Sequence, residues 1–218
     1  MNCANKRNSV LHQTTLTTER YIMAERIHTP EGTARWVSVF QPRQRQNKAG
    51  VDQGDPRYEI TIIFDEDADL KQMKAAAQAA GVEKFGAKFV EGVKKGKYLW
   101  PFADNATKVD DDDVPYAGYE NPGFSVKFKT KDKPGMVDAD AEPIMDKKDV
   151  YDGMRARVSC RAFAYDNESK GVAFYLINVQ KLGDGERMSG DPAAEDDFKP
   201  VKGAAKKVKK PAEDDDLL

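Results

Sequence analysis

The sequence predicts a mainly β fold with inserted helices, in which an antiparallel β-barrel is followed by a disordered C-terminal tail. Several segments alternate apolar and polar residues, the period of a strand with one buried face. Between two of these segments the apolar spacing becomes helical, and from Gly183 onward the apolar pattern is lost. We expect a disordered leader over 1–23, one domain over 24–185 and a disordered tail over 186–218.

Composition limits the classes of protein that the chain can belong to. The 218 residues include 35 basic and 37 acidic side chains, and the predicted domain is itself slightly acidic, so a site for a polyanion must be a local stripe. The two cysteines, Cys3 and Cys160, form no CxxC pair, so we expect no disulfide, no metal site and a reducing compartment. The sequence contains no run of 18 apolar residues, so it predicts no membrane-spanning helix. Translation can begin at Met1 or at Met23.

Two strands are expected early in the domain, over 35–41 and 57–64. In the first, Trp36, Ser38 and Phe40 should share one face and Arg35, Val37, Val39 and Gln41 the other. The segment between the strands contains Pro42 and Gly50 and is basic, so we expect a long mobile loop in which Arg43 can reach a ligand.

Two helices should follow the second strand. Asp65 or Asp67 can cap the first helix, and Gly81 can end it. The second should carry an apolar face of Val82, Phe85, Phe89 and Val93 that packs on the core.

The rest of the domain is predicted to be irregular over 97–122 and then mainly β. A strand over 123–130 has an apolar face and a basic face with Lys127 and Lys129. Two long strands, 154–165 and 171–181, should form a hairpin.

The first strand of that hairpin has two chemically different faces. Met154, Val158 and the small residues between them suit the interior of a curved barrel. The opposite row carries guanidinium groups, which pair with phosphates, and then aromatic rings, on which unpaired bases stack. Such a surface binds single strands of any sequence. Alternatively, the arginines pair with acids on neighbouring strands while Phe163 and Tyr165 cover a small core under the helices.

Other basic and aromatic residues can join this row. Tyr116 and Tyr119 either anchor their loop or offer exposed rings to bases. Four adjacent carboxylates, Asp110 to Asp113, cannot all converge on one ion, so we expect no metal there. The predicted DNA-binding set is Arg155, Arg157, Arg161, Phe163, Tyr165, Lys127, Lys129, Tyr116, Tyr119, Trp100 and Arg43.

The tail ends in an acidic run followed by two leucines, Glu213, Asp214, Asp215, Asp216, Leu217 and Leu218. One interpretation is a charged tail that only adds solubility. The other is that the acids compete with DNA for the arginines, while the exposed leucines bind the apolar pocket of a partner.

The chain resembles the single-stranded DNA-binding proteins of tailed phages. The resemblance lies in RIHTPEGTARWVSVFQPR, PYAGYENPG, the hairpin ARVSCRAFAYDNESKGVAFYL and the terminal EDDDLL. It implies an OB-fold body, coating of single strands in replication, recombination and repair, recruitment of replication and recombination proteins by the tail, and the host cytoplasm as location. Ending in leucines departs from the aromatic end common in better-known relatives.

The sequence holds no pattern expected of an enzyme, neither a nucleophile with its base nor a P-loop, so we expect no catalytic activity and no cofactor. A phage structural or scaffolding protein and a strand-annealing recombination protein are the alternatives. A homodimer is left open.

Overall fold

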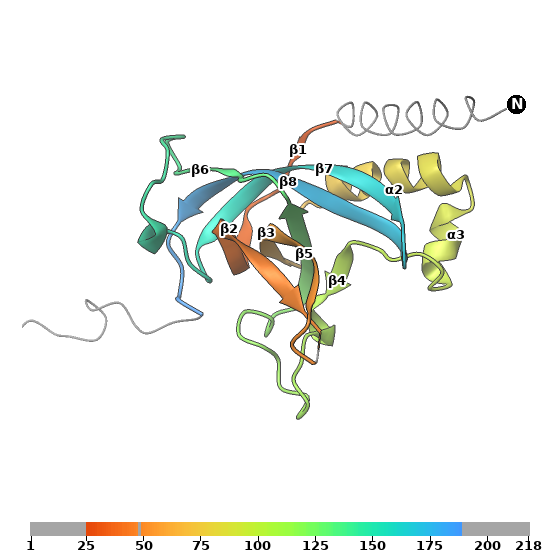
Figure 1. Cartoon of the computed structure of the whole chain (residues 1–218), viewed down its shortest axis with the longest axis horizontal. Coiled ribbons are helices and arrows are strands. Elements are labelled where there is room, and N and C mark those ends of the chain that lie inside the picture. Colours follow the sequence, from red (N-terminus) through yellow and green to blue (C-terminus); the bar gives the residue numbers. More distant parts are fainter. Residues whose placement is uncertain (1–24, 48, 189–218) are drawn as a thin grey trace, which may run out of the picture.

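The computed structural model describes residues 25–47 and 49–188, which form a closed β-barrel with helices packed beside it (Figure 1). Around the barrel the strand order is β7, β2, β3, β5, β8, and β8 pairs back to β7. All of these pairings are antiparallel except β5–β8, which is parallel. This is the five-stranded OB barrel, so the predicted fold class is confirmed. The strands are β2 (Gly32–Gln46), β3 (Asp52–Asp65), β5 (Gly123–Thr130), β7 (Arg155–Asp166) and β8 (Lys170–Gly183).

Short elements decorate the barrel. The helices lie between β3 and β5 in the sequence, and β4 pairs with β5. β1 pairs with β7, and β6 pairs in parallel with β8. Their bounds are β1 (Ile27–His28), α2 (Lys71–Phe85), α3 (Phe89–Lys94), β4 (Phe102–Asp104) and β6 (Gly135–Val137), with single 3-10 turns at Asn105–Thr107 and Lys147–Asp149.

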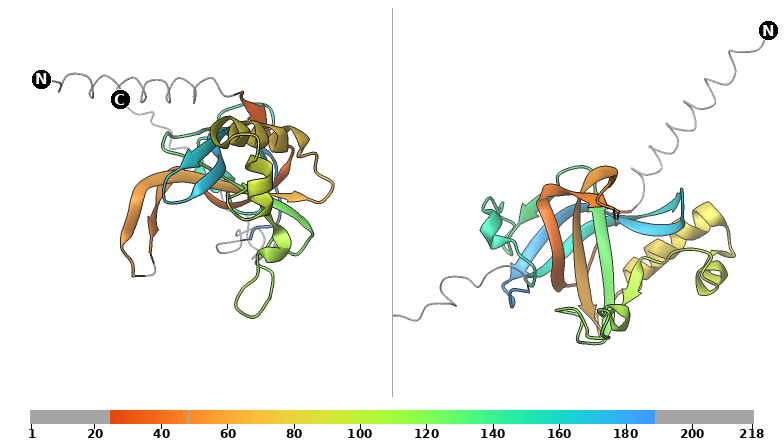
Figure 2. Two further views of the ribbon diagram at one scale, coloured as in Figure 1. Left: turned by 90° about the vertical axis from the view of Figure 1, so that its right-hand side faces the viewer. Right: turned by 60° about the horizontal axis from the view of Figure 1, so that its bottom comes forward.

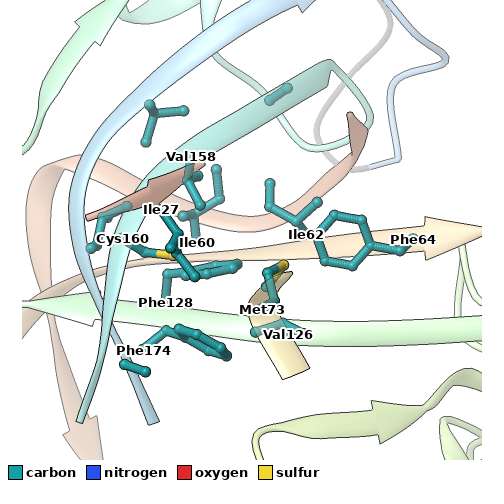
Figure 3. Close-up of a cluster of buried hydrophobic side chains, with 14 of the residues drawn as sticks. Ile27, Ile60, Ile62, Phe64, Met73, Val126, Phe128, Val158, Cys160 and Phe174 are labelled. Carbon is teal, nitrogen blue, oxygen red and sulfur yellow. The ribbon is translucent and has the colours of Figure 1, made fainter. Parts of the chain in front are cut away.

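The core fills the barrel from all of its strands (Figure 3). Ile60, Phe128, Phe174 and Ala162 are directly paired neighbours on β3, β5, β8 and β7, and all four are buried. Because directly paired residues share a face of the sheet, their neighbours in sequence must point outward. The predicted interior face of β7 is correct, since Met154 to Ala162 at every second position are buried.

The first predicted strand is interrupted by a bulge. Arg35 pairs with Thr61 and Ser38 with Glu59, so β2 has one more residue than β3 between these pairs. Ala34, Val37 and Val39 belong to or pack on the core. The predicted grouping of Arg35 with Val37 and Val39 is therefore wrong, because the extra residue changes the side to which Arg35 points.

The expected mobile loop after β2 is instead a two-stranded arm. β2 continues through Pro42 to Gln46, and β3 begins at Asp52, so the hairpin turns around Gly50, whose φ is 76°. Figure 2 shows the arm, in orange, projecting from the barrel. The residue types suggested a loop because both faces of the arm are polar and exposed, which removes the alternation of a half-buried strand.

The helix boundaries also differ from those predicted. α2 has Leu70 at its N-cap, where the Asp69 side chain accepts a hydrogen bond from the Lys71 N–H at 3.1 Å. It continues through Gly81 and ends at Gly86. Gly81 is buried against Phe89, and a Cβ there would lie 2.1 Å from the Phe89 ring. Glycine is therefore required at position 81 by the contact between α2 and α3, and it does not end the helix. Of the predicted second helix, Val82 and Phe85 lie on α2, whereas Phe89 and Val93 lie on α3.

The described chain continues beyond the predicted domain end at 185. The Met188 N–H donates to the Asp152 carbonyl at 2.9 Å, so 186–188 still lie against the barrel. The predicted leader over 1–23 and the tail from 189 onward lie outside the described residues. Within the described part, no helix is long and apolar enough to span a membrane.

Candidate nucleic-acid interface

One row of side chains crosses the outer surface of all five barrel strands. Arg161 on β7 pairs with Tyr175 on β8, Tyr175 with Lys129 on β5, Lys129 with Glu59 on β3, and Glu59 with Ser38 on β2. Each pair is a direct cross-strand neighbour, so the five side chains share the outer face. We call this set the outer row.

The three predicted arginines of β7 have different surroundings. Arg155 forms an ion pair with Glu31 at 2.7 Å and donates to the Thr33 hydroxyl, as the alternative interpretation of the sequence anticipated. The Nε of Arg157 donates to the Gln180 side chain. Arg161 lies in the outer row with its Nε buried and without a hydrogen-bond partner. Of the three, Arg161 therefore has the position best suited to a ligand on this face.

Aromatic rings continue the surface of β7 beyond Arg161. The rings of Phe163 and Tyr165 have centroids 6.3 Å apart and are partly exposed. Tyr175 adds a third ring beside Arg161, and its hydroxyl donates to Asp132. Burial, followed by this hydrogen bond, raises the pKa of Tyr175, so the phenol stays protonated. Partly exposed rings next to a cation are what base stacking requires.

A basic cluster adjoins the rings on β5 and the arm. Burial lowers the pKa of Lys129, and the nearby charges of Lys127, Arg45 and Arg57 lower it further, against the opposing effect of Glu59. The carboxylate beside Lys129 is loosely held, because Glu59 lies 3.8 Å from the Lys129 Nζ and 3.9 Å from an Arg43 nitrogen. The cluster therefore has more positive charge than its own acids neutralise.

The arm places two like charges opposite each other. Arg43 and Arg57 are directly paired across the arm, an arrangement that is unfavourable in a two-stranded ribbon without a bound anion. Arg43 is exposed, so it can meet a ligand crossing the outer row. The predicted role of Arg43 thus fits its position, although it lies on a strand and not on a mobile loop.

Three predicted aromatic contacts lie elsewhere. Trp100 packs against Phe89 and Phe102, with ring centroids 6.2 and 5.4 Å away, and belongs to the partly buried shell of the core. Tyr119 is 5% exposed, and burial raises its pKa. The buried ring of Tyr119 offers no face to a base, and Trp100 packs among the rings on the helix side of the core, so neither residue belongs to the outer row. Tyr116 is 45% exposed on the loop before β5.

The acidic run and the predicted tail site lie apart from this surface or outside the described residues. Over 25–47 and 49–188, no three His, Cys, Asp or Glu side chains gather in a group that could hold a metal ion. In the acidic run, Asp110 instead accepts from the backbone N–H groups of Asp112 and Val114. The tail residues Glu213 to Leu218 lie beyond the described chain.

Sequence reasoning missed one aromatic and two basic residues of this surface, besides Glu59 and Ser38 of the outer row. Tyr175 alternates with buried Phe174 and Leu176, a signal that was readable once β8 was recognised as a barrel strand. Arg45 and Arg57 were obscured because the arm looked like a loop. Their proximity to Lys129 depends on strand pairing, which no local pattern encodes.

A closed OB barrel with basic and aromatic side chains on its outer face has the architecture of proteins that bind single-stranded nucleic acids. The chain belongs to the family described as "Enterobacter phage Enc34, ssDNA-binding protein", whose model matches residues 26–217. The predicted family is thereby confirmed. No curated protein matches the chain.

Two solved structures of the Enc34 protein support the fold, and a third structure matches with a lower TM-score. The single-stranded DNA-binding protein of bacteriophage Enc34 in complex with ssDNA is 17% identical, with a TM-score of 0.54 over 75% of this chain and 89% of that chain. Its C-terminal truncation is 19% identical, with a TM-score of 0.52 over 74% and 87%. The single-stranded DNA-binding protein gp2.5 of bacteriophage T7 also matches, with 17% identity and a TM-score of 0.49 over 84% and 99%.

Proposed function

We propose that this chain binds single-stranded DNA without reading its sequence and has no catalytic role. The observation that supports this most directly is the outer row, where Arg161, Tyr175 and Lys129 are consecutive neighbours across three strands. Cations along such a row hold the phosphates, while the rings of Phe163 and Tyr165 receive bases, whose flat faces are common to all four. Membership of the Enc34 family supports the same ligand.

The outer row and the arm form a continuous path for a single strand. The path runs from the rings of β7 across Lys129 to the paired Arg43 and Arg57. Single strands fit such a path because their bases can turn toward the rings, whereas stacked bases in a duplex cannot. We therefore expect single strands to bind more tightly than duplex of the same length.

The test is a titration of fluorescently labelled oligothymidylate at several salt concentrations. A variant with Lys127→Ala, Lys129→Ala and Arg161→Ala loses three phosphate contacts, so the log–log salt slope should become less negative by about 2, at about 0.7 per phosphate. The matched control is Lys71→Ala, Lys84→Ala and Lys88→Ala, three exposed lysines on and after α2, which removes the same charge. Equal slopes in the two variants would show that the outer row is not the site.

For the tail we propose a regulatory role. Its acids act as a tethered competitor for the basic surface, and DNA releases Leu217 and Leu218 to bind replication or recombination proteins in the host cytoplasm. Deleting 211–218 should tighten binding to oligothymidylate. A weaker affinity after this deletion would refute competition.

The same titration, together with an assay of the pairing rate of complementary strands, separates the alternative functions. Equal affinity for single strands and duplex, or no binding of either, would favour a structural or scaffolding protein of the phage. Faster pairing of complementary strands in the presence of the chain would favour a strand-annealing protein.

A further inference from the structure

The bulge in β2 presents an exposed tryptophan in a conformation that side chains rarely adopt. Trp36 has a φ of 54°, in the left-handed region, although it is not glycine, asparagine or aspartate. Its side chain is 40% exposed, so burial of the indole offsets little of the free-energy cost of this backbone conformation. A strained residue persists only where its surroundings determine its conformation, and such residues cluster at functional sites.

A buried ion pair holds this bulge. Asp152 accepts from the Arg35 guanidinium at 2.9 Å through one carboxylate oxygen, and from the Val37 N–H at 2.9 Å through the other. It thereby fixes the backbone on both sides of Trp36. The side chains of Arg35 and Asp152 are only 8% and 11% exposed, so this ion pair is buried and holds the Asp152 carboxylate in place.

The chain that follows β8 supports the same residues from outside. The Met188 carbonyl accepts from Arg35 at 3.3 Å, and the Met188 N–H donates to the Asp152 carbonyl. Gly153, with a φ of 109°, lets this segment approach, since a Cβ there would lie 1.8 Å from the Glu186 carbonyl oxygen. Contacts from three separate segments therefore converge on the geometry of the bulge.

The indole is itself oriented by its neighbours. The Arg35 guanidinium lies over the ring, 4.4 Å from its centroid. The Trp36 side chain also lies next to the hydroxyl of buried Tyr119, where it opposes the rise in the pKa of that phenol. The guanidinium thus covers one face of the Trp36 ring, and 40% of the side chain remains exposed to a ligand.

The bulge adjoins the outer row. Trp36 lies in the ladder between the pairs Arg35–Thr61 and Ser38–Glu59, and the second of these pairs is the end of the outer row on β2 and β3. From this end of the row, Arg43 lies along β2 toward the arm and Trp36 lies toward the start of β2, so a contact at Trp36 extends the path in the direction away from the arm.

We propose that Trp36 is a base-stacking residue of the single-strand site and that Asp152 is its positioning residue. In the complex the indole lies between the Arg35 guanidinium and a nucleotide base. This inference rests on the proposed function, because it places a further contact on the same path.

The first experiment compares Trp36→Ala and Trp36→Phe with the full chain in titrations with oligothymidylate. Loss of one stacked base should weaken binding roughly 5- to 150-fold in Trp36→Ala and less in Trp36→Phe. Met145→Ala is the control, since Met145 is an 84% exposed apolar side chain on the loop after β6. Trp36→Ala with the same affinity as Met145→Ala would overturn the proposal.

Tryptophan emission gives an independent readout. The chain has two tryptophans, so Trp36→Phe leaves only Trp100. Stacking on a base should quench the emission of the full chain on binding, and most of this quenching should disappear in Trp36→Phe. Equal absolute quenching in both proteins would contradict stacking at Trp36.

The role of Asp152 is tested by a double-mutant cycle. Asp152→Asn should weaken binding in the full chain but cause no further loss in Trp36→Ala, because Asp152 acts through the indole. If Asp152→Asn does not fold, Arg35→Lys, which keeps a cation beside Asp152, takes its place in the cycle. Equal losses in both backgrounds would refute positioning. A full chain that binds no oligonucleotide would instead refute the proposed function itself.

Discussion

Replacing Glu59 with glutamine should make the chain bind single-stranded DNA more tightly while making the fold less stable. Glu59 is the one carboxylate of the outer row, and its side chain is 9% exposed. It lies 3.8 Å from the Lys129 Nζ, on the path that we assign to the phosphates. Glutamine keeps the shape of the side chain and removes only the charge.

The size of the effect follows from the distances. A phosphate oxygen that contacts the Lys129 Nζ at about 2.8 Å lies roughly 6–7 Å from the Glu59 carboxylate. At that separation two negative charges repel by about 0.6 kcal/mol in bulk water and by about 2.5 kcal/mol at an effective dielectric constant of 20. Removing this repulsion should tighten binding roughly 3- to 70-fold.

Stability should change in the opposite direction. Without the charge of Glu59, the positive charges of Lys127, Arg45 and Arg57 act on Lys129 with less opposition. Because the ion pairs of Glu59 are long, we expect a loss of only about 1 kcal/mol, or about 2–4 °C in Tm.

The assay is an anisotropy titration with labelled oligothymidylate, together with a thermal melt. The control is Glu66→Gln, an exposed residue just after β3, at the end of that strand opposite to the arm. The reasoning is refuted if Glu59→Gln binds no more tightly than Glu66→Gln at low salt. A gain that is as large at high salt as at low salt would also contradict an electrostatic cause.

Three further predictions concern protonation and packing. Burial lowers the pKa of Lys129 below its ordinary 10.5, and only the charged ammonium attracts a phosphate. The affinity for oligothymidylate should therefore fall as pH rises through that lowered pKa. Lys129→Arg should lose this pH dependence in the same anisotropy titration. Burial raises the pKa of the Cys160 thiol to about 12, so as pH rises the thiol ionises in the unfolded chain before it ionises in the folded one. The free energy of unfolding should therefore fall by up to about 1.4 kcal/mol per pH unit between about pH 9 and about pH 12. Denaturant melts at each pH should show a smaller fall in Cys160→Ala. Gly81→Ala should destabilise the fold by about 1–3 kcal/mol through its clash with Phe89, whereas Gly183→Ala, where a Cβ meets nothing within 4 Å, should be near neutral in thermal melts.

Much of the barrel could be read from local patterns. Strands with one buried face repeat every two residues, so the hairpin of β7 and β8 and the interior face of β7 were predicted almost to the residue. The arm was missed because both its faces are exposed, and α2 was cut short because Gly81 resembles a helix end. In the arm, backbone pairing makes strands of two polar segments, and in α2 the contact of Gly81 with Phe89 explains the glycine.

The candidate site was harder to predict for a related reason. The row on β7 was found from its alternation of cations and rings, but its neighbours depend on which strand lies beside which. Arg155 has the same local pattern as Arg161, yet Arg155 forms an ion pair with Glu31, whereas Arg161 lies beside Tyr175 on the neighbouring strand. Trp100 and Tyr119 are as aromatic as Phe163, but the core takes the first two.

Residue types and the spacing of a few positions were enough to predict the fold class, the interior face of β7 and the family. The row of Arg161, Tyr175, Lys129 and Glu59 depends on the tertiary structure, because closing the barrel joins strands that are far apart in the chain. The tertiary structure also decided that Trp36 is held outward by Asp152, which is more than a hundred residues away in sequence. Such contacts arise from the packing of the whole barrel, and no short segment encodes them.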